Sequence, residues 1–145
     1  MRSILTIGDH TSHSFTVTRE KTVPFLYPES AEFQEIPEVF ATGYMVGLME
    51  WACILSLKPA LEEGEGCLGV LIDVTHEAAT LPGQTVTVEA TVTSIEGRKV
   101  IWDVVARDEV DVIGRGRIGR AVVNWERFKS GLARKADALN SANIE

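Results

Sequence analysis

One stretch, residues 41–57 (ATGYMVGLMEWACILSL), limits what this chain can fold into. Its only charged side chain is Glu50, and its apolar residues lie on nearly every side when the stretch is drawn as a helix. Such a helix has to be covered by other parts of the fold. The sequence therefore predicts a central buried helix that carries one carboxylate where a carboxylate is costly.

The composition sets the size and class of the protein. With 145 residues, 45% of them hydrophobic, the chain is sized for one domain, which we place at residues 1–128 with a polar tail at 129–145. A net charge of −7 argues against nucleic acid or an anionic membrane as a general partner. Two cysteines without a signal peptide are typical of free thiols, so we expect a cytoplasmic protein.

The hydrophobic pattern changes after the helix. From residue 67 onward, apolar and polar residues alternate, which predicts strands over 67–78, 85–95, 99–107 and 112–125, with a first strand over 13–22. One long helix against an antiparallel sheet is an α+β fold. Such a sheet leaves open edges, and pairing of two edges would produce a homodimer.

His76 is the histidine with the strongest functional signal. The alternation places it on the same strand face as Val70, Ile72 and Val74, toward the helix. A lone histidine on an apolar face is more often a hydrogen-bonded core residue, but Glu50 is a core carboxylate that also lacks a partner. His10 and His13 have no third ligand near them in sequence, so we expect no metal site.

Two other segments allow more than one interpretation. Residues 23–40 contain three prolines and several aromatic residues, so they form either a lid or pocket wall or a loop that tucks against the core. Thr42 is either the N-cap of the helix or a functional hydroxyl.

The residues 114–119 (GRGRIG) match the glycine spacing of dinucleotide-binding loops. That motif works only between a strand and a helix, whereas this stretch runs on into residues typical of a strand. We therefore interpret these glycines as sites of backbone crowding.

Several longer segments carry a resemblance to a known family. VFATGYMVGLMEWAC (39–53), GEGCLGVLIDVTHEAAT (64–80) and the run from Ser94 to Val123 are similar to the fluoroacetyl-CoA thioesterase family, and the similarity extends over residues 21–128. The resemblance implies a hot-dog fold, in which a curled antiparallel sheet wraps a long central helix. It also implies an enzyme that hydrolyses a short-chain acyl-CoA.

The resemblance assigns roles to particular residues. It implies a catalytic set of Thr42, Glu50 and His76. The substrate-binding positions that it implies are Phe33 in the lid, Gly69 at the acyl site, Arg120 near the thioester, and position 36 in the gate. This chain departs from the family pattern at position 36, because the fluoroacetyl-selective member has phenylalanine where this chain has Ile36.

The residues themselves leave the mechanism open. His76 can act as a base near neutral pH, while Glu50 could orient His76 or attack the thioester itself. Thr42 could be the nucleophile or could position water. In a straight helix Thr42 and Glu50 lie about 12 Å apart along the axis. We expect no cofactor, because coenzyme A is part of the substrate.

Two alternative functions remain at this stage: a hot-dog hydratase or dehydratase, and a non-catalytic acyl-CoA sensor. Any of the three must hold the phosphates of coenzyme A on an acidic protein, which requires a local group of cations. We expect Arg120 in the pocket. Arg115 and Arg117 are either phosphate contacts or solvated surface, and Arg98 and Lys99 lie at the other end of the preceding strand.

Overall fold

The computed structural model describes residues 1–144. The elements follow one another as β1 (His10–Thr16), η1 (Arg19–Lys21), η2 (Val23–Phe25), α1 (Ala31–Gln34), α2 (Thr42–Leu57), η3 (Lys58–Ala60), β2 (Glu65–Val74), β3 (Thr85–Glu96), β4 (Lys99–Arg107), β5 (Val112–Asn124) and α3 (Trp125–Ile144). The five strands form one antiparallel sheet in the order β1-β3-β4-β5-β2.

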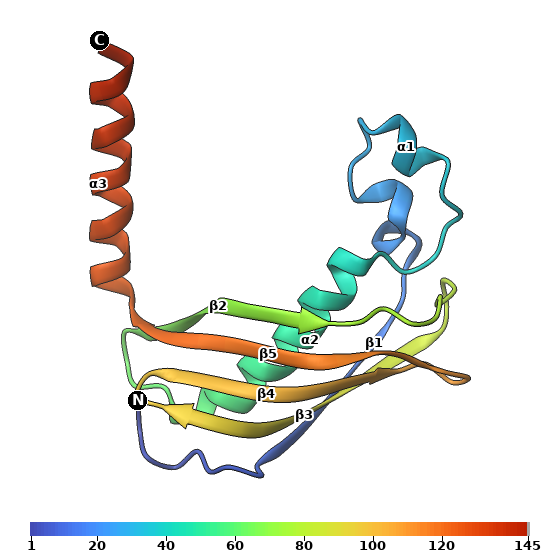
Figure 1. Ribbon diagram of the computed structural model, residues 1–145, viewed down its shortest axis with the longest axis horizontal. Coiled ribbons are helices and arrows are strands. Elements are labelled where there is room, and N and C mark those ends of the chain that lie inside the picture. Colours follow the sequence, from blue (N-terminus) through green and yellow to red (C-terminus); the bar gives the residue numbers. More distant parts are fainter. Residues whose placement is uncertain (145) are drawn as a thin grey trace.

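Helix α2 lies across one face of this sheet and contacts all five strands (Figure 1). Alternate residues of β3 and β4 are fully buried beneath it, as the period-two pattern predicts. At the centre, the indole nitrogen of Trp102 donates a hydrogen bond to the hydroxyl of Ser56 at 2.9 Å, which joins β4 to α2. The predicted α+β arrangement of one long helix on a curled sheet is confirmed.

The sheet covers only one side of α2. Met45, Met49 and Ala52 are fully buried, but the Trp51 side chain on the outer face is 46% exposed. Gly47 on the same outer face has no neighbour within 4 Å of where a Cβ would stand. The helix is therefore less enclosed within one subunit than its all-round apolar sequence predicts.

Strand β2 differs from its prediction in both length and facing. It ends at Val74, and its register against β5 shifts between Gly69 and Leu71. A shift of this kind turns the following side chains to the other face. Before the shift, Cys67 pairs with buried Val122 and faces the helix, so Leu68 lies on the outer face against prediction. After the shift, Ile72 pairs with buried Ile118 and faces the helix side as predicted, but at this open edge Ile72 is 48% exposed, and Val70, at the shift itself, is 52% exposed. β2 is also an edge of the sheet.

The two ends of the chain also differ from expectation. β1 spans His10–Thr16, and part of the segment predicted to continue it forms η1 instead. The predicted polar tail belongs to α3, a helix that rises away from the sheet (Figure 1); residue 145 lies outside the described residues. No helix in residues 1–144 combines the length and apolarity needed to cross a membrane.

Residues 23–39, which we call the lid segment, form a closed loop that contains η2 and α1. Its base is fastened by backbone bonds from Val23 N to Val39 O at 3.0 Å and from Ala41 N to Lys21 O at 3.0 Å. Inside it, the Ser30 hydroxyl accepts a bond from Phe33 N and so caps α1. The lid segment lies at the opposite end of the molecule from α3 (Figure 1).

The glycine run at 114–119 lies inside β5, beside β2, so it has no place in a dinucleotide loop. Gly116 has a φ of 150°, and a Cβ on it would overlap the carbonyl oxygen of Asp73. Backbone crowding, as predicted, accounts for this glycine.

Replacement of Gly116 by alanine should therefore lower the free energy of unfolding by at least ~2 kcal/mol, because the new methyl group meets backbone atoms that cannot move independently. Gly47→Ala is the matched control. It adds a methyl group in open space on a helix, so it should be neutral or stabilising by up to ~1 kcal/mol. Denaturant unfolding measures both, and equal stabilities for the two variants would contradict this account.

Candidate active site

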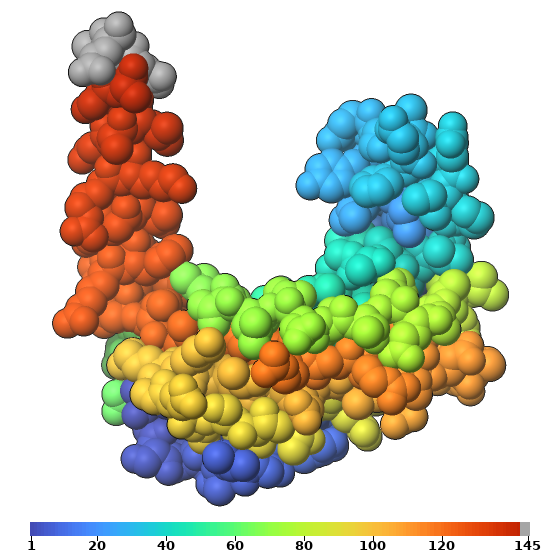
Figure 2. Space-filling view, in the orientation of Figure 1, coloured from blue at the N-terminus to red at the C-terminus, as the bar shows by residue number. Residues whose placement is uncertain are grey.

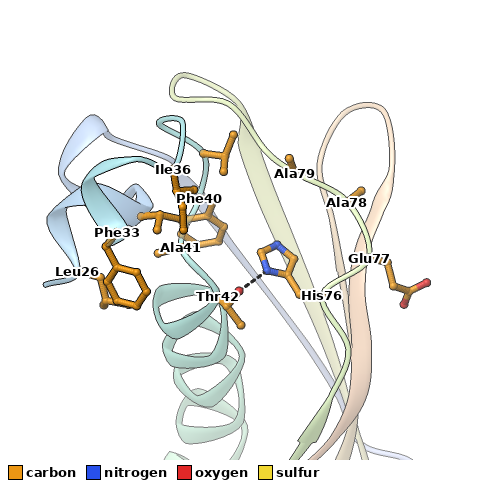
Figure 3. A pocket seen from close by; sticks show the side chains of 12 residues that line it. Leu26, Phe33, Ile36, Phe40, Ala41, Thr42, His76, Glu77, Ala78 and Ala79 are labelled. Carbon is orange, nitrogen blue, oxygen red and sulfur yellow. Dashed lines mark hydrogen bonds between the residues drawn. The ribbon is translucent and has the colours of Figure 1, made fainter. Parts of the chain in front are cut away.

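Thr42 and His76 form a hydrogen-bonded pair at the start of α2. Thr42 is the first residue of the helix, and Ala41 occupies the N-cap position without a side-chain bond. The Thr42 hydroxyl instead lies 2.7 Å from Nδ1 of His76 (Figure 3). Of the two interpretations of Thr42, the cap is wrong, and the hydroxyl faces the histidine.

His76 lies two residues beyond the end of β2. Backbone bonds from Thr75 N to Arg115 O and from Glu77 N to Ile113 O hold this extension against β5. Burial lowers the pKa of His76 below its ordinary value of 6.5, and the backbone of Ala78 offsets part of that shift. The ring is therefore neutral at neutral pH. Its Nε2 is buried without a hydrogen-bond partner among the described residues.

The pair opens into a hollow of about 450 Å³. Its walls are mostly apolar and come from the lid segment, the start of α2 and the chain after β2: Val23, Leu26, Phe33, Ile36, Val39, Phe40, Ala41, Thr42, His76, Glu77, Ala78 and Ala79. Figure 3 shows Phe33 and Leu26 on one side of Thr42 and His76 on the other. The lid segment is therefore a pocket wall, the first of its two interpretations.

The predicted gate residues Phe33 and Ile36 both line this hollow. Phe40 supplies a second ring, whereas Tyr27 is exposed and packs against Phe33 at a centroid distance of 5.7 Å. Several lining residues, among them Leu26 and Val39, were not singled out from the sequence. The sequence signal that could have identified them as pocket residues is their apolar character next to the prolines of the loop.

A second polar centre lies farther along α2. Oε2 of Glu50 accepts a bond from the Arg120 guanidinium at 2.5 Å. The rest of that guanidinium donates to Sγ of Cys67 and to the Cys67 carbonyl, each at 3.0 Å. Arg120 is only 6% exposed. The partner of the core carboxylate is thus Arg120, and the contact with Cys67 had no signal in the sequence.

Gly69 belongs to this second centre. It pairs with Arg120 across β2 and β5, and a Cβ on it would stand 2.6 Å from Oε2 of Glu50. A side chain at position 69 would therefore displace the carboxylate. The structure thus brings Glu50, Gly69 and Arg120 together.

Within one subunit the predicted site residues form two groups. Thr42 and His76 lie at the hollow, while Glu50 lies eight residues along the same helix, about 12 Å away along its axis. Within this chain Glu50 is therefore too far from His76 to orient it. Arg120, which we expected in the pocket, is absent from the hollow's lining.

The remaining candidate groups are outside the hollow or unreactive. Arg115 and Arg117 form exposed ion pairs with Glu77 at 3.0 Å and Asp73 at 3.2 Å. Burial raises the pKa of the Cys53 thiol to about 12, so it stays protonated and is not a nucleophile.

Comparison with known proteins agrees with this geometry. Residues 17–126 match the family described as fluoroacetyl-CoA-specific thioesterase. A fluoroacetyl-CoA thioesterase from Streptantibioticus cattleyicolor is 54% identical over 138 residues, covering 95% of this chain and 99% of that protein.

Solved structures give the same result. A variant of the fluoroacetyl-CoA thioesterase FlK in complex with fluoroacetate is 55% identical, with a TM-score of 0.88 over 90% of this chain and 98% of that one. A Thermus thermophilus protein described as a thioesterase superfamily member is 30% identical, with a TM-score of 0.86 over 96% of this chain and 98% of that one. The hot-dog fold is confirmed, and the chain belongs to the fluoroacetyl-CoA-specific thioesterase family.

Proposed function

We propose that this thioesterase hydrolyses short-chain acyl-CoA, fluoroacetyl-CoA among its substrates, to the free acid and coenzyme A. The observation that carries the proposal is the 2.7 Å contact between the Thr42 hydroxyl and a neutral, buried His76 at the wall of an apolar hollow. A thiol-release assay with fluoroacetyl-, acetyl- and propionyl-CoA tests it. The hydratase and the sensor are not favoured, because the family and relatives are thioesterases.

The pair supplies the elements of acyl transfer. The oxygen nucleophile, either the Thr42 hydroxyl or a water bound beside it, attacks the thioester carbon while His76 takes its proton. The C–S bond then breaks, and His76 returns the proton to the departing sulfur. If threonine attacks first, a water activated by the same histidine cleaves the resulting ester.

Glu50 and Arg120 have a different part in this proposal. Glu50 is held by Arg120 and lies against the backbone of Gly69, so it is a fixed negative charge on the inner side of the β2 edge. Within one chain this carboxylate is paired with Arg120 and far from His76, so it can attract the positive charge on a histidine base only across a subunit interface. We expect no cofactor, and the two buried free thiols, Cys53 and Cys67, support a cytoplasmic location.

We further propose that two copies pair along β2, with the active sites near the interface. β2 exposes Val70 and Ile72 at an unpaired edge, which is the type of strand that recruits another. The other edge, β1, carries polar residues instead, such as Ser12 and Ser14. Light scattering at micromolar concentration should give twice the mass of one chain, and a strict monomer would contradict the pairing.

Replacement of His76 by alanine should lower turnover by at least ~10²-fold, the usual contribution of an acid–base group. The melting temperature should change little, because the ring is neutral and borders a hollow. His10→Ala makes the same change on the surface and should leave both unchanged.

Glu50→Gln should also lower turnover, but with a loss of roughly 1–3 kcal/mol of stability, because buried Arg120 loses its counter-charge. Melts and single-turnover kinetics on the same samples separate the two effects. Normal turnover per folded molecule in His76→Ala and Glu50→Gln would contradict their catalytic roles.

Ile36 should determine how strongly the enzyme prefers fluoroacetyl over acetyl groups. One methylene in an apolar pocket is worth only about 1–3 kcal/mol, so strong selectivity needs more than pocket size, such as an aromatic gate that excludes water. Ile36→Phe should therefore raise the ratio of kcat/KM for fluoroacetyl-CoA to that for acetyl-CoA. Val110→Phe, on the exposed turn between β4 and β5, should leave the ratio unchanged. A ratio that Ile36→Phe fails to raise would count against the gate.

A further inference from the structure

Helix α3 leaves the body of the subunit almost without cover. Its first residue, Trp125, is fixed at the root, because its backbone N–H donates to Gly64 O at 3.0 Å and its indole fills the place of a Cβ at Gly66. Beyond the root, every side chain from Leu132 to Ala142 is exposed. A helix in a protein owes most of its stability to the packing of an apolar face, so α3 requires a surface to lie against.

The surface that α3 offers is an apolar stripe with positive flanks. Phe128, Leu132 and Leu139 follow one another at helical spacing, and the two leucines are 51% and 59% exposed. Lys129 and Lys135 each stand three residues from Leu132, which places them on either side of the stripe, about 60° away.

The charge of α3 is opposite to that of the whole chain. The helix contains four basic and two acidic residues, a net charge of +2, on a protein with a net charge of −7. None of the four basic side chains has a carboxylate within ion-pair distance among residues 1–144. An acidic surface is therefore the kind that the flanks of the stripe would attract.

The lid segment is such a surface. It contains four glutamates and no lysine or arginine, a net charge of −4. Three of them, Glu29, Glu32 and Glu35, are exposed and have no ion-pair partner in the described part of the chain. Tyr27 is exposed as well, and its ring packs on Phe33, which lines the active-site hollow. The lid segment thus offers an apolar ring together with free carboxylates.

Both surfaces stand at the free edge of the sheet. Figure 2 shows α3 and the lid segment rising from opposite ends of the β2 edge, with the edge open between them. α3 follows Asn124, which pairs with Glu65 at the start of β2, whereas the lid segment shares its hollow with His76, just beyond the end of β2. In an antiparallel pair of β2 strands about a two-fold axis, the start of each strand lies beside the end of the other. Each α3 then comes to the lid segment of the other subunit.

The two surfaces cannot meet within one subunit. β2, which separates them, has ten residues and spans about 33 Å. α3 is anchored at its far end and rises away from the sheet (Figure 1). A second copy of this chain is therefore the occupant with which charge, apolar surface and position all agree.

We propose that α3 of each subunit packs along the outer surface of the partner subunit's lid segment. Its apolar stripe covers the partner's Tyr27, and Lys129 and Lys135 face the glutamates of that lid segment. Because Tyr27 packs on Phe33, the contact holds one wall of the partner's active-site hollow in place. The inference rests on the pairing along β2 proposed above and goes beyond it, since pairing of the strands alone does not require α3.

The first test maps the contact in the whole protein. A water-soluble carbodiimide joins a lysine to a touching carboxylate as an amide, with loss of water. It should produce a covalent dimer on a denaturing gel, in which mass spectrometry finds Lys129 or Lys135 joined to the lid segment. Lys129→Gln with Lys135→Gln keeps good helix formers and should remove this dimer, whereas Lys99→Gln should leave it.

The second test asks whether the contact holds the lid segment. Leu132→Ser with Leu139→Ser removes the stripe without changing the active site. A glutamate-specific protease should then cut the lid segment several-fold faster, and kcat/KM for fluoroacetyl-CoA should fall about three- to tenfold through changes in both kcat and KM. Ala133→Ser with Ala138→Ser introduces the same residues off the stripe and should leave both measurements unchanged.

The outcomes separate the proposals. A dimer whose links join the lysines to Glu126 or Asp137 of another α3 would overturn the contact in favour of a helix pair. A dimer without links to the lid segment, or unchanged lid cleavage in the stripe variant, would also overturn it and would leave the pairing along β2 intact. A strict monomer would overturn the contact and the pairing together. Hydrolysis is measured separately, by the thiol-release assay, and none of these results would overturn it.

Discussion

The ion pair between Glu50 and Arg120 is the contact on which the arrangement of this fold depends. A guanidinium that is almost wholly buried requires a counter-charge and acceptors for its remaining hydrogens. Glu50 supplies the first from α2, and Cys67 supplies the second from β2, so the pair joins α2, β2 and β5. Because these contacts fix the position of α2 along the sheet, its first residue, Thr42, lies beside His76.

Much of this fold could be predicted from the sequence because its signals are local. The apolar stretch predicted α2 to within a residue at its start, and strict alternation predicted β3 and β4 with few errors at the ends. The kinds of side chain at the site could also be predicted: a hydroxyl at a helix start, a carboxylate within a core helix and a histidine near a strand.

What could not be predicted depends on contacts between distant segments. Alternation assumes an unbroken strand, so the register shift after Gly69 leaves Ile72 on the helix side as predicted but places Leu68 on the outer face. The sequence also does not show which charged or polar side chains pair with one another. Glu50 and His76 looked like two unpartnered groups, and each has a different partner in the structure. The alternation of polar and small residues in α3 was too weak to separate a helix from an irregular tail.

The fastened base of the lid segment has a consequence for how such enzymes diversify. Because the bonds from Val23 to Val39 and from Ala41 to Lys21 close the loop at its root, changes within it need not reach the sheet or the start of α2. Phe33 and Ile36 lie inside that closed loop, whereas Thr42 and His76 lie outside it. Residues that select the acyl group can therefore vary between descendants while the reacting pair is inherited unchanged.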